Sequence, residues 1–383
     1  MLTHLSAREF RNFGHLDVRV PAHGLVVVGE NGHGKTNLLE ATAYLSLLRS
    51  MRGARDVDMI RFGAPALHVR AELSAPSSVQ SVSVGYERST KKKKVTLDGV
   101  EQTRLTAALG ALPSVGFSPA DVALVAGSPA ERRRYLDVAL ALSSREYLAA
   151  LQHFRAALAR RNAVLRQAQR DLARASTYTE QLRVWEPALA AQGAVVTAIR
   201  HQFVHGHEAR FAELGVAIGE ARPVMIRYMV SSLVSDREQA PVDQARAELI
   251  AFYAEQYTKA FAQHRAQEMR RGVTLVGPHR DELSMLLGGR DLRTFGSAGQ
   301  QRSAAIALRL LELATLRESL GASPLLLLDD PFAELDLRRS ARVLRLLEDQ
   351  GIEQVLLAVP RTEDIPEAFT RLDRRTMHEG LLT

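Results

Sequence analysis

A glycine-rich segment between an apolar run and a helical pattern constrains the fold more than any other part of the sequence. The segment GENGHGKT, residues 29–36, follows the run LVVV at 25–28 and fits the pattern G-x-x-x-x-G-K-[ST]. After it, Leu38, Ala41 and Leu45 recur at the spacing of one helix face. A strand, a glycine loop and a helix in this order are typical of a phosphate-binding loop, so the sequence predicts an α/β fold built around this unit.

The residue types in this loop suit a nucleoside triphosphate, for which we predict ATP, bound with Mg²⁺. The glycines allow backbone N–H groups to point at phosphate oxygens, where the helix dipole adds positive potential. Lys35 is expected to reach the β- and γ-phosphates, and the Thr36 hydroxyl to ligate Mg²⁺. The predicted ATP-binding residues of the loop are Gly29, Glu30, Asn31, Gly32, His33, Gly34, Lys35, Thr36 and Asn37. The alternative is a glycine turn that binds nothing.

A distant segment, SPLLLLDDPFAELD at 323–336, supplies the carboxylates that a triphosphate site needs. Its leucines predict a buried strand, with Asp329 and Asp330 at the end of that strand. We predict that Asp329 holds Mg²⁺ through water, and that Asp330 and Lys35 are catalytic, with Asp330 polarising the attacking water. Taken without the phosphate loop, the two aspartates could equally be solvated caps of a turn.

A third segment, FGSAGQQRSAAIALRLLEL at 295–313, predicts a helix that begins after a serine. Ser297, Gly299 and Gln300 stand at the start of this helix. A hydroxyl group and exposed N–H groups at a helix start suit a second anion site. The alternative is an ordinary helix N-cap.

Together these segments resemble the ATP-binding-cassette (ABC) class of ATPases. The shared features are the phosphate loop, then S-x-G-Q at a helix start, then LLLLDD, then AELD at 333–336. In that class the serine motif of one subunit contacts the γ-phosphate held by the other, so that two heads enclose two ATP molecules. The resemblance therefore implies an ATP-dependent homodimer, a role in trans for Ser297 and Gln300, and a place at the dimer interface for Asp336.

The spacing of the motifs narrows the class. Transporter ATPases place the serine motif much closer to the phosphate loop, and SMC proteins insert very long coiled coils, for which this chain shows no sustained heptads. We therefore expect an ABC-type ATPase head, lobe I, with an inserted and mostly helical lobe II and no long coiled coil. The expected domains are 1–125 and 272–383 for the two parts of lobe I, and 126–271 for lobe II.

The finer resemblance is to the RecF family of bacterial DNA-repair ATPases. Similar segments occur in the expected order along the chain: FRNF at 10–13, NGHGKTNLLEA at 31–41, SPAERRRYLD at 128–137 and TLVGPHRDEL at 274–283. The resemblance implies an ATP-gated dimeric clamp on duplex DNA near single-strand gaps. It also implies RecR as a partner, in the loading of RecA during recombinational repair and replication restart.

One departure from the cassette pattern concerns the strand QVLLAV at 354–359. A histidine often follows this strand in cassette ATPases, but here Pro360, Arg361 and Thr362 follow. The group that senses the γ-phosphate is therefore not identified. We expect a weak, DNA-stimulated ATPase whose hydrolysis releases the clamp rather than driving a motor.

Basic residues supply the candidate contacts with DNA in a chain of net charge +7. Such groups would neutralise backbone phosphates and give salt-sensitive, sequence-independent binding. For any single cluster the alternative is a solvated face. The candidates are Lys91, Lys92, Lys93 and Lys94 at the tip of an expected hairpin, and Arg132, Arg133 and Arg134, with Arg160 and Arg161, on expected helices.

Two further groups of residues have two interpretations each. Arg11 and Asn12 of FRNF either touch the nucleotide or form a structural turn. His279, Arg280 and Asp281 either meet nucleotide or DNA, or form a charged structural turn, which is the interpretation that we adopt.

Composition and the N-terminal sequence exclude other classes of function. The chain has no cysteine, so disulfides, a thiolate zinc site and a cysteine nucleophile are excluded. Neither an apolar signal core nor a membrane-length apolar run occurs, so we expect a cytoplasmic protein without a membrane partner. Two alternative functions remain: an ATPase subunit of an ABC-type transporter, and a structural DNA-binding protein with a degenerate nucleotide site.

Overall fold

The computed structural model shows two compact units in the chain. One unit contains Met1–Val122, Ala217–Gly219 and Ala305–Thr383, and the other contains Ala123–Val216 and Glu220–Ala304. The residues that the structure describes are 1–74, 77–171, 174–231, 245–333 and 335–383.

These units bear on the expected domain boundaries. The break after Val122 lies close to the expected boundary at 125, whereas residues 272–304, which we had assigned to lobe I, pack within the second unit. The strand at Glu282–Leu287 pairs with the strand at Val224–Met229 and packs on the helix at Pro129–Ser143, which keeps this stretch with the helices. The assignment of functional lobes stays a prediction.

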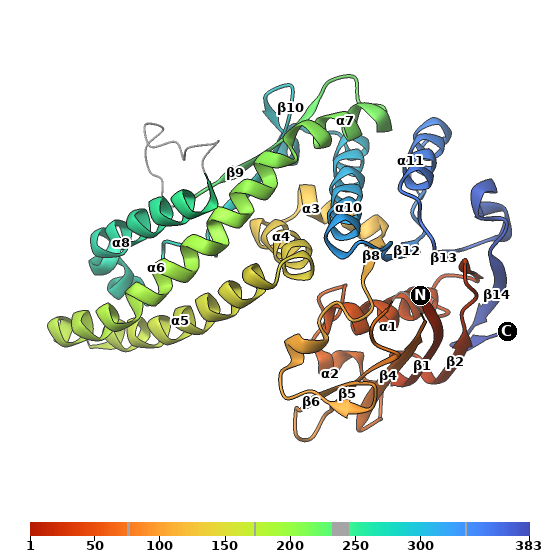
Figure 1. Ribbon diagram of the computed structural model, residues 1–383, viewed down its shortest axis with the longest axis horizontal. Coiled ribbons are helices and arrows are strands. Elements are labelled where there is room, and N and C mark those ends of the chain that lie inside the picture. Colours follow the sequence, from red (N-terminus) through yellow and green to blue (C-terminus); the bar gives the residue numbers. More distant parts are fainter. Residues whose placement is uncertain (75–76, 172–173, 232–244, 334) are drawn as a thin grey trace. The chain divides into compact units, whose positions relative to one another are not determined.

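The first unit contains two sheets (Figure 1). Its antiparallel sheet is made of β1 (Leu2–Phe10), β2 (Phe13–Arg19), β4 (Ala66–Leu73), β5 (Ser81–Glu87), β6 (Lys93–Leu97) and β7 (Val100–Glu101). Its other sheet is made of β3 (Gly24–Val28), β8 (Ser114–Phe117), β12 (Leu325–Asp329), β13 (Val355–Val359), β14 (Asp373–His378) and β15 (Leu381–Leu382). The strand orders are β2-β1-β4-β5-β6-β7 and β15-β14-β3-β13-β12-β8.

The burial of the strands follows from the kind of sheet. Strand β4 alternates, with Leu67, Val69, Ala71 and Leu73 buried and the residues between them exposed or half-buried, as expected for an antiparallel sheet with one solvated face. Strands β3, β12 and β13 are almost continuously buried, which is typical of parallel strands covered on both faces. In the second sheet only β15 pairs antiparallel, against β14.

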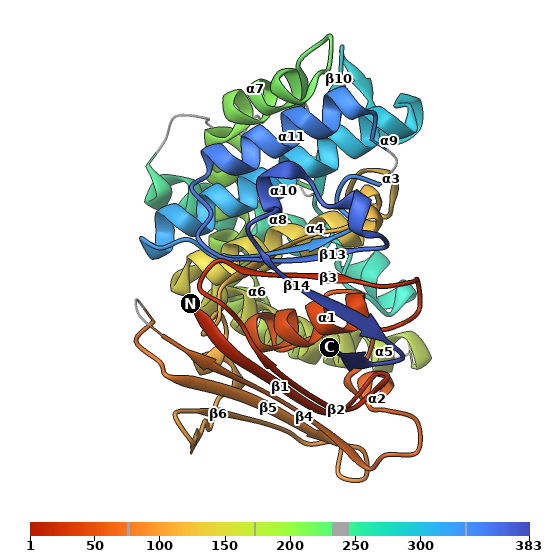
Figure 2. The same ribbon diagram turned by 90° about the vertical axis from the view of Figure 1, so that its right-hand side faces the viewer.

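Helix α1 (Lys35–Leu47) occupies the space between the two sheets, as Figure 2 shows. It packs against β12 and β13 on one side and against β4 and β5 on the other. Its helical pattern was predicted, but its burial is nearly complete, and even Glu40 is inaccessible to solvent. Short helix α2 (Asp56–Met59) packs on β5, and α11 (Leu337–Asp349) follows β12.

The second unit is mostly helical, as predicted. Its elements are α3 (Ala123–Ala126), α4 (Pro129–Ser143), α5 (Arg145–Arg170), α6 (Ala175–Gly206), most of α7 (Glu208–Ile218), α8 (Arg246–Arg271), α9 (Leu292–Phe295), β9 (Val224–Met229), β10 (Glu282–Leu287) and β11 (Arg290–Asp291). The long helices α5, α6 and α8 pack together around Phe154, Tyr257 and Phe261, and no long coiled coil occurs in the described part of the chain. Helix α10 (Ala298–Leu320) begins in this unit and continues into the first.

A buried ion pair joins α5 to α8 and corrects one sequence-based interpretation. The Arg161 side chain is inaccessible to solvent, and its guanidinium donates to Glu268 at 2.6 Å, to Glu186 at 3.0 Å and to Thr274 at 2.9 Å. Arg161 therefore cannot contact a nucleic acid from this position. Its neighbour Arg160 does lie outward, with its guanidinium carbon 4.9 Å from the centre of the Trp185 ring.

Candidate nucleotide-binding site

Parallel pairing brings the predicted site residues to one sheet edge. Strand β13 pairs with β3 on one side and with β12 on the other, so the carboxyl ends of the three strands lie together. The phosphate loop leaves β3 at this edge, and Asp329 ends β12 there. The structure thus joins two segments that are far apart in the sequence.

Two glycines of the loop lie where a side chain would collide with the backbone or with a fixed neighbour. Gly34 has φ +115°, and a Cβ atom there would lie 2.7 Å from Nδ2 of Asn12. A Cβ atom at Gly29 would lie 2.3 Å from the carbonyl oxygen of Met377. The loop can therefore hold its shape against β14 and Asn12 only with glycine at both positions.

Lys35 and Thr36, the first residues of α1, carry the strongest candidate groups. Nζ of Lys35 donates to the carbonyl oxygens of Gly29, at 2.5 Å, and of Glu30, at 2.9 Å. Oγ1 of Thr36 donates to Oδ1 of Asp329 at 3.0 Å. The ammonium group therefore lies inside the loop, beside the N-terminus of α1, where an anion is favoured.

A cation and a carboxylate in this site are both desolvated. Burial lowers the pKa of Lys35, although Asp329 and Asp330 partly oppose this. Burial likewise raises the pKa of Asp329, against the opposing hydrogen bond from Thr36 and the charge of Lys35. A site with a desolvated cation and a desolvated carboxylate is suited to a ligand that carries phosphate and a divalent cation.

The oxygen donors at this edge fit Mg²⁺. A hydroxyl and a carboxylate within hydrogen-bonding distance of each other are hard ligands of the kind that Mg²⁺ takes, together with phosphate oxygens and water. Among the described residues no group of three or more histidine, cysteine, aspartate or glutamate side chains is placed to hold a metal ion. A magnesium site here would therefore depend on Thr36, Asp329 and a bound phosphate.

Asp330 follows directly and has an uncommon backbone conformation. Its φ is +45°, in the left-handed region, and its N–H donates to the carbonyl of Ala358 at 2.9 Å. The turn sends the chain away from β12 just beyond the sheet edge. Such strained residues cluster at functional sites, which supports, but does not test, the predicted catalytic role of Asp330.

Asn12, Asn37 and Arg52 brace the loop, and of these only Arg52 was not among the residues that the sequence indicated. Asn12 donates to the carbonyl of His33 at 3.1 Å and accepts from the side chain of Asn37 at 2.8 Å. Nη1 of Arg52 donates to Oδ1 of Asn37 at 3.3 Å. Asn12 therefore supports the loop, while a contact of FRNF with the nucleotide stays a prediction. A run such as SMRGAR gives no sign that Arg52 reaches α1.

Arg11 of FRNF reaches the buried face of α1. Its guanidinium forms a two-point ion pair with Glu40, at 2.8 and 3.0 Å, and Ser50 also donates to this carboxylate. A carboxylate that no water can reach needs such a partner. Arg11 therefore secures the helix that begins with Lys35.

The serine motif shows a reciprocal cap at its helix start. The Ser297 N–H donates to Oε1 of Gln300 at 2.9 Å, and the Gln300 N–H reaches Oγ of Ser297 at 3.3 Å. The N-cap alternative thus describes the local geometry, while Ser297 remains exposed and Gly299 and Gln300 half-exposed. Their role toward a phosphate held by another subunit stays a prediction. In AELD, Glu334 lies outside the described residues, and Asp336 caps α11 by accepting from the N–H of Arg339 at 2.9 Å.

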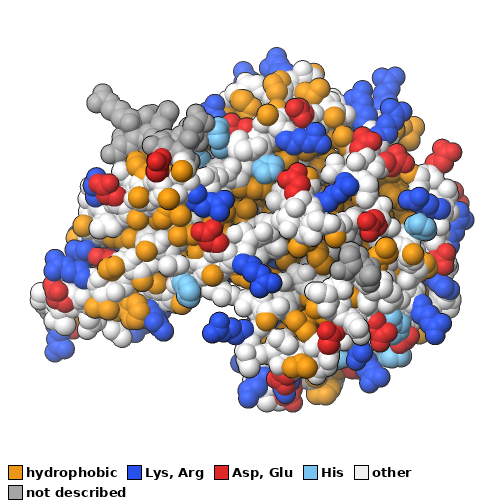
Figure 3. Space-filling model, viewed as in Figure 1, with side chains coloured by type: hydrophobic (Ala, Val, Ile, Leu, Met, Phe, Trp, Pro, Cys, Tyr) orange, Lys and Arg blue, Asp and Glu red, His pale blue; other side chains and the backbone are white. Residues whose placement is uncertain are grey.

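The structure separates the basic candidates into exposed and engaged side chains. Lys91, Lys92 and Lys94 are exposed, whereas Nζ of Lys93 turns inward to Asp56, at 2.8 Å, and to the Leu48 carbonyl, at 2.6 Å. Lys93 is therefore not placed for a phosphate contact. On the face seen in Figure 3, blue and red side chains are interspersed rather than gathered into one basic surface.

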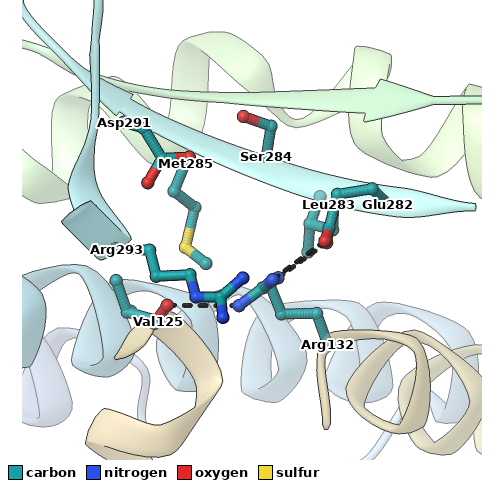
Figure 4. Close-up of a pocket in the computed structure, with 8 residues that line it drawn as sticks. All are labelled: Val125, Arg132, Glu282, Leu283, Ser284, Met285, Asp291 and Arg293. Carbon is teal, nitrogen blue, oxygen red and sulfur yellow. Dashed lines mark hydrogen bonds and ion pairs between the residues drawn. The ribbon is translucent and has the colours of Figure 1, made fainter. Parts of the chain in front are cut away.

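Arg132 is buried, which corrects the expectation that it contacts DNA. It is only 3% exposed, and its guanidinium pairs with both carboxylate oxygens of Glu282, at 2.7 and 2.9 Å. Figure 4 shows this pair at a pocket of about 60 Å³, where Arg132 also donates to the carbonyl of Val125. Arg133 is half-buried and donates to the carbonyl of Asp281 at 2.9 Å, and Arg134 is half-buried.

Asp281 is the centre of a buried network, in agreement with the structural interpretation of GPHRDEL. Its carboxylate accepts from the Tyr228 hydroxyl at 2.6 Å and from the Ser231 N–H at 2.9 Å. Burial raises the pKa of Asp281, and these hydrogen bonds oppose that rise. The neighbouring Arg280 and His279 both reach the carbonyl of Thr274.

The described helices give no indication of a membrane-spanning segment, since none of them is both long and apolar enough to cross a bilayer.

This fold and site define a phosphate-loop ATPase head of the ABC and SMC type. The family described as "RecF/RecN/SMC N terminal domain" matches residues 1–381. The chain belongs to this family and, within it, to the RecF proteins.

Named relatives show how close this membership is. The chain is 38% identical to the "DNA replication and repair protein RecF" of Rhodococcus erythropolis, over 94% of this chain and 90% of that protein. It is 36% identical to the protein of the same name from Halalkalibacterium halodurans, over 90% of this chain and 89% of that one. A solved structure of the "recombination mediator protein RecF-ATPrS in RecFOR pathway" matches 100% of this chain and 97% of that chain, with a TM-score of 0.84 and 25% identity.

Proposed function

We propose that this chain is an ATP-binding protein of DNA replication and repair, and that the nucleotide controls its hold on DNA. The proposal rests on one observation: Lys35, Thr36 and Asp329 lie together at the carboxyl ends of the parallel strands. The Thr36 hydroxyl is 3.0 Å from the Asp329 carboxylate. The names of the relatives support the cellular process, and the bound ATPrS of one relative supports the ligand.

In this proposal the phosphate loop binds the triphosphate through its backbone and through Lys35. The ammonium group, now directed at the carbonyls of Gly29 and Glu30, turns toward phosphate oxygens that replace them. A magnesium ion held by Thr36 and Asp329 would neutralise charge on the β- and γ-phosphates. Asp330 orients and polarises the water that attacks the γ-phosphate.

The γ-phosphate then joins two copies of the chain. Ser297 and Gln300 of the partner subunit would contact this phosphate, and the two-fold symmetry doubles every contact. A few charge-assisted hydrogen bonds at each of the two sites would together stabilise such a dimer by several kcal/mol. Hydrolysis removes the shared phosphate and separates the subunits, as in other switches that a γ-phosphate controls.

The closed dimer holds duplex DNA near single-strand gaps and acts with RecR in the loading of RecA. Contacts with the phosphate backbone give this binding its sequence independence. Hydrolysis is weak and DNA-stimulated, since Pro360 and Arg361 stand where a cassette ATPase often has its histidine, and Arg361 is engaged with Asp364 at 3.1 Å. None of the relatives named above is a transport protein, so the transporter alternative has no support.

Sedimentation of the protein with ATP, with ADP or without nucleotide, in the presence and absence of a gapped duplex, tests the proposal. We expect dimers and DNA complexes with ATP only. Lys35→Met is expected to abolish both, because it removes the buried ammonium group from the loop. Lys259→Met, a change of the same kind at an exposed position on α8, should leave both intact.

The same experiment can refute ATP gating. If Lys35→Met dimerises and binds DNA as the unaltered protein does, the nucleotide does not control either process. The chain would then be a structural DNA-binding protein with a degenerate nucleotide site.

A further inference from the structure

A basic pocket of about 450 Å³ lies in the first unit, apart from the phosphate loop. Two segments form it: the stretch from Arg49 to Val57, which follows α1, and the hairpin of β5 and β6. The labels α2, β5 and β6 lie next to one another in Figure 1, and α2 packs on β5. Its charged lining residues are Arg49, Arg55, Arg88, Lys91 and Asp56.

The acidic group of the pocket is already paired from behind. The Asp56 carboxylate accepts from Nζ of Lys93 at 2.8 Å and from the Tyr44 hydroxyl at 2.9 Å. Both partners lie on the core side, since Lys93 is only 13% exposed and Tyr44 is buried. Asp56 therefore does little to neutralise the basic side chains in front of it.

Two of those basic side chains have no acidic partner within the described ranges. Arg88 reaches only the carbonyl oxygen of Ala64, at 3.4 Å, and Lys91 is exposed at the turn with φ +53°. Arg55 is paired with Asp58, at 2.8 Å, and is highly exposed. Like charges that converge on a hollow repel one another, and an anion in the hollow relieves the repulsion.

The chemistry of the lining favours a phosphodiester over a protein segment. Forked guanidinium groups and a lysine suit phosphate oxygens. Apart from half-buried Tyr86, the pocket has only Ala54 and Val57 as apolar groups, which offer a partner protein no deep anchor. The pocket shares no residue with the phosphate loop, so it is separate from the candidate nucleotide site.

We infer that this pocket binds the phosphate backbone of DNA, with Arg88 and Lys91 as its principal contacts. The inference rests on the proposed DNA-binding function and assigns a place to it. The sequence indicated all four lysines of the run as candidates for contact with DNA. In the present inference only Lys91 makes this contact, while Lys93 supports the pocket from the core side and Lys94 points to the opposite face of the sheet.

The two faces of the antiparallel sheet provide a matched control. Tyr86 pairs with Leu67, whose side chain is buried on the core side. Arg70 pairs with Ser83 and Lys94 pairs with Gly85, so side-chain alternation places both on the opposite face. A double charge reversal on each face changes the net charge equally, but only one of the two alters the pocket.

The experiment measures binding of a fluorescein-labelled gapped duplex with ATP over a series of salt concentrations. We expect Arg88→Glu/Lys91→Glu to lower the affinity at least about tenfold at low salt, and to make the slope of log K against log salt shallower by about two. Arg70→Glu/Lys94→Glu should retain the affinity within about twofold. ATP binding should be unchanged in both variants, which verifies their folding.

Each other outcome overturns the inference. Equal losses in both variants would mean that only the net charge matters, and a loss confined to Arg70→Glu/Lys94→Glu would place DNA on the opposite face. Unchanged binding in the pocket variant would leave the pocket for another anion, such as an acidic peptide. If the unaltered protein fails to bind the duplex at all, the proposed function itself fails, which is a different result.

Discussion

His279 couples the stability of the second unit to pH. Its ring is buried, with Nε2 3.2 Å from the Thr274 carbonyl, and burial lowers its pKa to about 4. Because an unfolded histidine titrates near 6.5, the unfolded chain takes up this proton first as the pH falls. The contribution of His279 is therefore intact above pH 6.5 and is lost progressively toward pH 4, by about 2 kcal/mol at pH 5.

Urea unfolding of the unaltered protein and of His279→Gln at pH 7.5 and pH 5 measures this contribution. The amide of the variant can still donate to Thr274, but it does not titrate. We expect the loss of unfolding free energy between the two pH values to be smaller in the variant by about 2 kcal/mol. Equal losses in the two proteins would show that the proton goes elsewhere.

Single residues also mark the limit of what the sequence could predict. The strand, glycine loop and helix around Gly29 to Thr36 form as predicted, because glycines, a lysine and a threonine at fixed spacing have few other uses. Burial of Arg132 was not predictable, because its acceptor Glu282 lies on a strand far along the chain. Because side chains alternate along a strand, Lys93 points to the core face of the sheet and Lys94 to the opposite face. The sequence could have predicted this difference only if the first residue of β6 had been known.

At the scale of elements, the buried ion pair between Arg161 on α5 and Glu268 on α8 predicts how much a substitution lowers the free energy of unfolding. Arg161→Leu leaves Glu268 buried without its cation, and loss of one partner of such a pair costs about 3–5 kcal/mol. Arg160→Leu, at the next position, removes only a contact with the Trp185 ring and should cost less than about 1 kcal/mol. Urea unfolding followed by far-ultraviolet circular dichroism compares the two, and similar costs would contradict a central role for the buried pair.

Local patterns were sufficient for the elements but not for their pairing. The strand before the phosphate loop, the buried strand LLLLD and the helix after Ser297 all form as predicted. The strand order of the parallel sheet could not be predicted. Strand β3 pairs with β13 and β14, which lie far from it in the sequence, and pairing between such distant strands leaves no local sequence pattern. The break between the compact units near Ala304 falls inside the uninterrupted helix α10, so no linker marks it in the sequence.

For the whole molecule, the proposed dimer predicts a variant that separates ATP binding from association. Ser297→Arg should bind ATP as the unaltered protein does, because the phosphate loop is untouched. It should not dimerise, because a bulky cation replaces the exposed hydroxyl that would face the partner's nucleotide. Ser319→Arg, near the exposed end of the same helix, serves as the control. Sedimentation with ATP decides, and dimers of Ser297→Arg would refute the role in trans.

The position of β3 between β13 and β14 has a consequence during synthesis on the ribosome. The apolar strand that leads into the phosphate loop is made long before either of its two sheet neighbours. At 5–20 residues per second it waits roughly 15 to 65 seconds for β13 to emerge. A nascent or truncated chain thus exposes an unpaired β-branched strand to chaperones and proteases.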